Sequence, residues 1–206
     1  MRRTKHDAES TRLNIMAHAL DLFSQRGVSS TSLVDIATNA GVTRGAIYWH
    51  FQNKWDLFES IWQHYAAPVQ ALSKASHSAS ETDPLGKLVE LLKFVFVSVA
   101  EQENFRRMFT MCLRESVAPA GKDGAEPIQA LMREWHNNCR LTLDNAVKKS
   151  QLPKNLDIEA GAIMLRAMVE GIVLNWISTP ERYDLSKRSD QFVDAIIGVL
   201  KHSLTL

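Results

Sequence analysis

The residues best suited to chemistry in this sequence lie at positions 42–51, VTRGAIYWHF, where three aromatic rings, a histidine and an arginine fall within ten residues. Tyr48, Trp49, His50 and Phe51 are consecutive, so on a helix they point in nearly every direction. A helix that packs on a core spaces its bulky residues three and four apart, with polar residues between them. We therefore expect some of these rings to face a partner.

Two short helices joined by a glycine-containing turn are predicted to carry this segment. Ser32 opens the sequence S-L-V-D, which has the spacing of a capping box with aspartate in the position of glutamate. Gly41 ends the first helix, and Thr43 can cap a second helix at 44–50. Two short helices joined by a three-residue turn are typical of a helix-turn-helix.

A helix-turn-helix places the first residues of its second helix against base edges in the major groove of DNA. Arg44 is the best candidate for a bidentate contact with guanine, Ala46 can pack against a thymine methyl group, and Gly45 keeps the helix close to the groove. The other candidates cap this helix or face phosphates. The predicted DNA-binding residues are Ser32, Thr43, Arg44, Gly45, Ala46, Tyr48, Trp49, His50 and Lys54.

Core packing is the alternative interpretation of each ring and apolar side chain in this segment. We adopt it for Ile47 and Phe51, which lie four residues apart and form an inward-facing pair. It explains Tyr48 and Trp49 less well, because a seven-residue helix cannot bury all its faces. His50 could equally cap a neighbouring helix.

Composition describes an ordinary soluble protein and gives no general reason to expect a polyanionic partner. The 206 residues are 45% hydrophobic and 23% charged, with 24 Lys and Arg against 23 Asp and Glu. Local charge matters more: Arg2, Arg3 and Lys5 could form a basic arm for phosphates, or simply a solvated terminus. Cys112 and Cys139 are too few for a disulfide framework, so buried thiols are expected.

The hydrophobic periodicity is helical almost throughout, which predicts an all-α fold. A polar string at 73–83 is predicted to be an exposed connection. The predicted helices span residues 10–26, 32–40, 44–50, 54–72, 84–100, 103–117, 126–150, 157–178 and 187–204.

A cytoplasmic location is expected from two features. The chain does not open with a charged region followed by an apolar one, as a secretory signal would. The longest apolar region, 160–177, contains Arg166, Glu170 and Asn175, which argues against a membrane span.

Residues 31–58 resemble the DNA-binding segment of TetR-family transcriptional regulators, whose pattern is T-x-x-x-I-A-x-x-A-G-V-[ST]-x-G-x-x-Y-x-x-F-x-x-K-x-x-L. Ser32 stands in the threonine position, and the remaining fixed positions are filled by Ile36, Ala37, Ala40, Gly41, Val42, Thr43, Gly45, Tyr48, Phe51, Lys54 and Leu57. Within the family, residues 2–12, 41–51, 83–92 and 143–157 look most like repressors of multidrug efflux pumps, the AcrR, AcrS and TtgR type.

The resemblance implies a nine-helix subunit, with a DNA-binding domain at 1–53 and a ligand-binding and dimerisation domain at 54–206. It implies a homodimer on a double-stranded, pseudo-palindromic operator, repression by blocking RNA polymerase, and release by a hydrophobic or aromatic small molecule. No cofactor, metal or membrane partner is implied. A regulator of other genes, or an activator that drugs do not induce, remains an alternative.

The two last apolar helices are the expected dimer interface, because residues 158–177 are apolar nearly all round and need burial on more than one side. A wholly intramolecular core is the alternative. The predicted interface residues are Gly171, Trp176, Phe192, Ile196, Val199 and Leu200.

The effector pocket is expected from the resemblance, by matching helix positions, although apolar residues at these spacings are equally consistent with plain packing. Arg166 and Glu170 could orient a ligand or simply pair with each other. The predicted pocket residues are Tyr65, Leu88, Leu91, Leu92, Val95, Phe109, Leu113, Trp135, Cys139, Arg166, Val169 and Glu170.

A helical enzyme is the alternative from another functional class. The sequence has no nucleophile elbow, no H-E-x-x-H and no phosphate-binding loop, and its seven histidines lack metal-ligand spacing. We therefore predict a protein that is not an enzyme.

Overall fold

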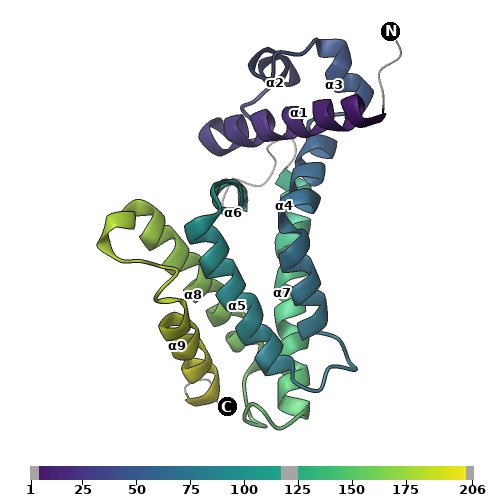
Figure 1. Cartoon of the computed structure of the whole chain (residues 1–206). Coiled ribbons are helices and arrows are strands. Elements are labelled where there is room, and N and C mark those ends of the chain that lie inside the picture. The colour runs from purple at the N-terminus through teal and green to yellow at the C-terminus, as the bar shows by residue number, and fades with distance from the viewer. Residues whose placement is uncertain (1–4, 117–124, 203–206) are drawn as a thin grey trace. The chain divides into compact units, whose positions relative to one another are not determined.

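The computed structural model describes residues 5–116 and 125–202, which form nine α-helices, one short 3-10 helix and no strand (Figure 1). The predicted all-α fold is thus confirmed for this part of the chain. Arg2 and Arg3 of the predicted basic arm lie outside the described residues. The helices are α1 (Lys5–Arg26), α2 (Leu33–Asn39), α3 (Arg44–His50), α4 (Lys54–Ser76), α5 (Pro84–Glu101), α6 (Glu103–Ser116), α7 (Ala125–Lys148), α8 (Ile158–Ser178), η1 (Pro180–Arg182) and α9 (Ser189–His202).

The chain folds into two compact units that differ from a simple division along the sequence. Unit 1 comprises residues 1–66 and 104–129, and unit 2 comprises residues 67–103 and 130–206. Helix α6 therefore belongs with the N-terminal helices, although nearly forty residues separate it from them. The predicted functional boundary between residues 53 and 54 stays a prediction.

Unit 1 is built on α1, whose apolar stripe lies against the short helices. Ile15, Ala19, Leu22 and Phe23 are buried, as their helical spacing predicts. Asn14 Nδ2 donates to the carbonyl of Ala40 at 2.9 Å, which ties α1 to the end of α2. Helices α2 and α3 also pack on each other, so the three helices form one body.

Unit 2 has α5 at its centre, packed against α8 and α9.

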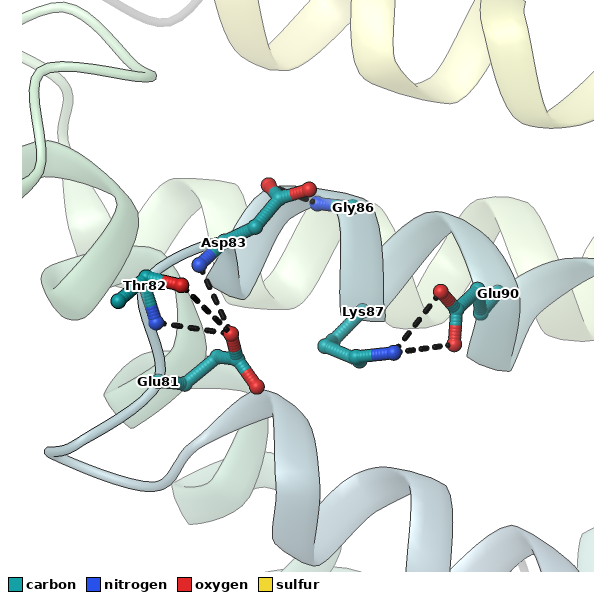
Figure 2. Close-up of polar contacts among 6 residues, drawn as sticks. All are labelled: Glu81, Thr82, Asp83, Gly86, Lys87 and Glu90. Atoms are coloured by element: carbon teal, nitrogen blue, oxygen red, sulfur yellow. Dashed lines mark hydrogen bonds and ion pairs between the residues drawn. The ribbon is translucent and has the colours of Figure 1, made fainter.

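The start of α5 is held by its own capping residues (Figure 2). Asp83 Oδ1 accepts from the Gly86 N–H at 2.9 Å, and Glu81 Oε1 accepts from the Asp83 N–H at 2.9 Å. These bonds lower the pKa of the Asp83 and Glu81 carboxyl groups, because they favour the charged form.

The predicted exposed connection at 73–83 is wrong in its first part, because α4 continues through residue 76. Ser76 is buried, and its Oγ lies 3.1 Å from Thr142 Oγ1 of α7. Asn145 Nδ2 donates to the His77 carbonyl at 3.1 Å. The polar residues at this point are therefore not solvated like a loop, because the Ser76 hydroxyl and the His77 carbonyl have hydrogen-bond partners on α7.

Helix α8 is long and apolar enough to cross a bilayer by length and composition alone, a test that core helices of water-soluble proteins also pass. Its buried side faces the core of unit 2 through Leu165, Val169 and Val173. Arg166 and Glu170 form an ion pair on the same helix, which does not fit a lipid environment.

Candidate nucleic-acid interface

The first helix of the predicted motif, α2, begins with the capping box that the sequence predicts. Ser32 Oγ accepts from the Asp35 N–H at 3.1 Å, and Asp35 Oδ2 accepts from the Ser32 N–H at 3.1 Å. The Ser32 hydroxyl also donates to Asp35 Oδ2 at 2.6 Å, which lowers the pKa of that carboxyl. Ser32 is exposed, but its hydroxyl already has a partner within the chain.

The second helix, α3, is fixed at its start by local contacts. Thr43 Oγ1 accepts from the Ala46 N–H at 3.2 Å, so Thr43 is the predicted cap. The preceding turn contains Gly41 at φ +65°, and the Val42 N–H donates to the Ala37 carbonyl at 3.0 Å. Helices α2 and α3 are therefore joined by a closed, hydrogen-bonded turn.

The side chains of α3 divide between core and solvent. Ile47 and Phe51 are buried, as predicted for the inward pair. Trp49 and Tyr48 are 71% and 48% exposed, which is unusual for large rings in a region that packs well elsewhere. His50 is half-buried, with its ring centroid 4.5 Å from that of Trp49.

Arg44 lies exposed on the first turn of α3 and is held by its neighbour one turn away. Its guanidinium carbon lies 5.4 Å from the centre of the Tyr48 ring, and Nη2 is 3.5 Å from the Tyr48 hydroxyl. A guanidinium resting on an aromatic face keeps its outer N–H groups available to an acceptor. Arg44 and Tyr48 therefore form one exposed donor surface.

Gly45 and Ala46 give α3 a shallow profile beside Arg44. A methyl group added at Gly45 would come no closer to the described atoms than 3.9 Å from Thr43 Oγ1. The chain itself therefore has room for a side chain at this exposed position. Because glycine has no side chain, a partner can approach the backbone of α3 closely at this position. Ala46 is half-buried.

Lys54, which is predicted to contact a phosphate, has partners within the chain. Its ammonium donates to the Ser29 carbonyl at 3.0 Å and lies 5.9 Å from the Trp55 ring centre. The side chain is half-buried. In this structure Lys54 therefore joins α4 to the connection between α1 and α2.

Arg12 of α1 contacts the residue that follows α3, a contact that the sequence patterns did not indicate. Its guanidinium carbon lies 5.1 Å from the centre of the Phe51 ring, and Nη2 donates to Ser60 Oγ of α4 at 2.9 Å. Arg12 thus connects α1 with α4 and with the end of α3. An arginine on the polar side of an amphipathic helix carries no signal that distinguishes it from a solvated charge.

Two sequence comparisons bear on these features. Residues 15–61 match the profile of bacterial regulatory proteins of the tetR family. Residues 83–202, which are more than half of the chain, match that of the C-terminal region of MAATS-type transcriptional repressors.

The chain belongs to the TetR family.

Two curated relatives match the chain over nearly its whole length. The HTH-type transcriptional regulator TtgR of Pseudomonas putida is 36% identical over 207 residues, covering 100% of this chain and 99% of TtgR. The HTH-type transcriptional regulator AcrR of Shigella flexneri is 36% identical, covering 95% of this chain and 92% of AcrR. Both relatives are named as transcriptional regulators.

Two solved structures resemble this chain over nearly its whole length. A complex of SmeT with triclosan has a TM-score of 0.79 at 27% identity, covering 96% of this chain and 95% of SmeT. NalD, the secondary repressor of the MexAB-OprM multidrug efflux pump in Pseudomonas aeruginosa, has a TM-score of 0.77 at 29% identity, covering 97% of this chain and 100% of NalD. Both neighbours share the TetR architecture.

The residues predicted to line an effector pocket of this TetR-family chain fall in both compact units. Tyr65, Phe109 and Leu113 lie in unit 1, where burial raises the pKa of Tyr65 and its hydroxyl accepts from Asn104 Nδ2 at 3.4 Å. The remaining residues lie in unit 2, and the buried ones are Leu88, Leu91, Leu92, Val95, Cys139 and Val169.

A polar cluster inside unit 2 brings four predicted residues together. Arg166 Nε donates to Glu170 Oε1 at 2.6 Å, and the guanidinium carbon lies 5.8 Å from the Trp135 ring centre. Burial raises the pKa of the Cys139 thiol to about 12, while the nearby Arg166 charge opposes that shift. Arg166 and Glu170 are partly buried and paired, so both predicted alternatives for them are compatible with this geometry.

Three of the six residues predicted for a dimer interface are buried inside the chain itself. Ile196, Leu200 and Trp176 are buried in unit 2, and Trp176 Nε1 donates to the Tyr183 carbonyl at 3.1 Å. They contribute to the core of one subunit because the apolar stripe of α9 packs on α5 and α8. Phe192 and Val199 are half-buried, and Gly171 is exposed.

A different face of α8 is open. Ile163, Ala167, Gly171 and Leu174 follow a spacing of four, four and three residues along it, and all are exposed. Met164 adds to this face, which we call the α8 face. Of these residues only Gly171 is predicted from the sequence, because a helix that is apolar all round does not reveal which side its own chain covers.

Within the described residues, no group of three or more His, Cys, Asp or Glu side chains could hold a metal ion.

Proposed function

We propose that this TetR-family chain is a homodimeric repressor that binds a pseudo-palindromic operator through α3. The observation that carries the proposal is the exposed surface of Arg44, Tyr48 and Trp49 on a helix fixed by the buried Ile47. Exposed donors on the first turns of a second helix suit base edges and flanking phosphates. Thr43 and His50 flank this surface, and Ser32 lies at the start of α2.

The α8 face supports the dimeric state. Exposed aliphatic residues at helical spacing are buried best by another apolar surface, and a second copy of the same helix supplies one. Two subunits related by a two-fold axis present two α3 helices, so the operator should have two half-sites about one helical turn of DNA apart, or a multiple of that spacing.

We further propose that the chain controls a multidrug efflux operon from the cytoplasm and is released by hydrophobic or aromatic ligands. The relationship to efflux pump repressors supports this, as does the aromatic and charged cluster of Trp135, Arg166 and Glu170. The ligand must bind the DNA-free state more tightly than the DNA-bound state, and DNA must weaken the ligand by the same factor.

Selection from a random duplex library tests the DNA-binding proposal. The purified chain should enrich an inverted repeat, and fluorescence anisotropy should give affinities for it at least about a thousandfold above random DNA. The operator affinity should fall linearly with the logarithm of salt concentration, because phosphate contacts release counterions. Equal affinity for every duplex would exclude sequence-specific repression.

A small-molecule panel tests the ligand proposal. Triclosan, cationic dyes and phenolic antibiotics should each be measured for thermal stabilisation of the free protein and for release of the selected operator. Glu170→Gln should weaken the cationic members selectively, because it removes the negative charge from the polar cluster. Operator binding that no compound alters would favour the alternative, a regulator that drugs do not induce.

A further inference from the structure

The connection between α1 and α2 has an unusual backbone at its first residue. Gly27 is buried with φ +87°, a left-handed conformation that favours glycine. A Cβ at this position would lie 2.7 Å from Glu115 Oε1, inside any normal contact distance. The α1–α2 turn (residues 27–31) therefore leaves room for a carboxylate from α6.

That carboxylate is the buried end of a charged side chain. Glu115 is 6% exposed, and its Oε1 accepts from the Val28 N–H at 2.9 Å, although the two residues are 87 positions apart. A buried carboxylate is tolerated only where hydrogen bonds replace water. The bond from Val28 thus serves both the carboxylate and a backbone N–H that would otherwise lose its partner on folding.

The next residue of the same turn is held from another helix. Lys54 Nζ of α4 donates to the Ser29 carbonyl at 3.0 Å, while Thr31 Oγ1 donates to the Gly27 carbonyl at 2.8 Å within the turn. An anionic group from α6 and a cationic group from α4 therefore hold adjacent backbone groups of one short connection.

Helix α6 also contacts α1, the helix that comes before the α1–α2 turn. Arg107 Nη1 lies 2.9 Å from Asp21 Oδ1, and Arg114 Nη1 donates to the Gln25 carbonyl at 3.0 Å. With Glu115, these contacts follow the chain from the last turns of α1 into the α1–α2 turn. The N-cap of α2, Ser32, comes directly after that turn.

We propose that Glu115 is a positioning residue for DNA binding, which sets the α2–α3 pair by fixing the α1–α2 turn from α6. This inference rests on the proposed function. It gives α6 a direct polar connection to the helix-turn-helix, in addition to the continuous helix α4. Loss of the carboxylate should misplace α3 while leaving the rest of unit 1 folded.

Three variants of the full-length chain test the role. Glu115→Ala removes the acceptor, and Glu115→Gln keeps an acceptor oxygen without the charge. Glu59→Gln is the matched control, because it makes the same charge change at an exposed residue of unit 1 that accepts a hydrogen bond from Gln63 on the same helix. Each is measured on the operator selected by the wild type and on a random duplex of equal length.

Glu115→Ala should bind the operator on the order of tenfold more weakly, with random DNA changed by less than about twofold. Glu115→Gln should lie between, roughly threefold weaker, because a neutral acceptor makes a weaker bond. Hydrogen exchange at the Val28 amide should accelerate in the same order. Glu59→Gln should match the wild type in every measurement.

A structural role alone predicts a different pattern. A smaller folded fraction lowers affinity for both duplexes equally, and that outcome would overturn the inference, as would unchanged operator binding by Glu115→Ala. If Glu115→Ala does not fold, wild-type operator affinity in Glu115→Gln would overturn it. Failure of the wild type and Glu59→Gln to prefer any duplex would instead refute the proposed function, and the inference with it.

Discussion

The helices α3 and α8 both expose large apolar side chains, and their exposed surfaces differ in chemistry. On α3 the exposed residues are Tyr48 and Trp49, rings with a hydroxyl and an N–H, beside the guanidinium of Arg44. On α8 the exposed residues are Ile163, at 53%, and Leu174, at 47%, which have no polar atoms.

The difference indicates two kinds of partner. Aromatic side chains with polar tips can stay hydrated and then exchange water for phosphate oxygens, so they suit a charged, wet interface. Aliphatic side chains gain only by losing water, so they suit a dry interface between protein surfaces. The exposed fraction of a side chain does not distinguish the two kinds of interface, whereas the chemistry of its exposed atoms does.

The largest expected effect comes from placing a charge on the α8 face. Ile163→Glu should dissociate the proposed dimer and weaken operator binding by about 100-fold or more, because a monomer contacts one half-site and loses the gain from linking two. Light scattering with size exclusion measures the mass, and anisotropy measures the affinity.

Leu141→Glu is the control for Ile163→Glu, since Leu141 is exposed to a similar extent, 49%, but lies on α7. It should remain dimeric. Dissociation by both variants to the same degree would mean that the α8 face has no special role.

Removing Arg44 should have the next largest effect and should act on sequence preference. Arg44→Ala should lose about tenfold in operator affinity, with relaxed preference at one base pair in each half-site, because a bidentate base contact is lost. Random DNA should be affected far less. Similar losses on operator and random DNA would show that Arg44 contacts only phosphates.

Removing the Trp49 ring should have a smaller and less selective effect. Trp49→Ala should weaken operator and random DNA alike, by about fivefold, because we expect the indole N–H to donate to a phosphate. Its thermal stability should equal that of the wild type, since the ring is 71% exposed. A marked fall in melting temperature would mean that the ring belongs to the core.

The cysteines provide a comparison of the two units without changing DNA binding. Cys112 lies in unit 1 and Cys139 in unit 2, and burial raises the pKa of each thiol from 9.0 to about 12, with the charge of Glu115 adding to the shift at Cys112. Both should react with a thiol reagent at pH 8 far more slowly than in the unfolded chain.

The raised pKa values of the two thiols also set the direction in which the stability of the protein depends on pH. The folded thiols hold their protons more tightly than the unfolded ones, so their contribution to stability is complete below pH 9 and is lost as pH rises toward 12. Thermal melts of the wild type against Cys112→Ala and Cys139→Ala measure it. Fast labelling of one cysteine alone would show that its unit opens locally.

Local sequence patterns were sufficient to predict the caps and the buried pair of the helix-turn-helix. Ser32 and Thr43 cap α2 and α3 because each hydroxyl reaches an N–H only three residues ahead, and the buried pair of Ile47 and Phe51 follows from a spacing of four. These patterns did not show the hydrogen bond of Lys54, whose acceptor, the Ser29 carbonyl, lies 25 residues away in the chain.

The C-terminal helices were harder to interpret from sequence. Periodicity identified α8 and α9 as apolar, yet it assigned Ile196 and Leu200 to a partner when they pack inside unit 2. An apolar stripe shows that a residue will be buried, and it does not show which surface will bury it.

The sequence by itself determined the all-α fold, the family and the capped, donor-rich α3, because these depend on groups within a few residues of one another. Only the tertiary structure decided which face of α8 stays open, that Arg12 supports α3, and that Glu115 reaches the α1–α2 turn across 87 positions. Such contacts form only when distant segments pack, and no local pattern encodes which ones will meet.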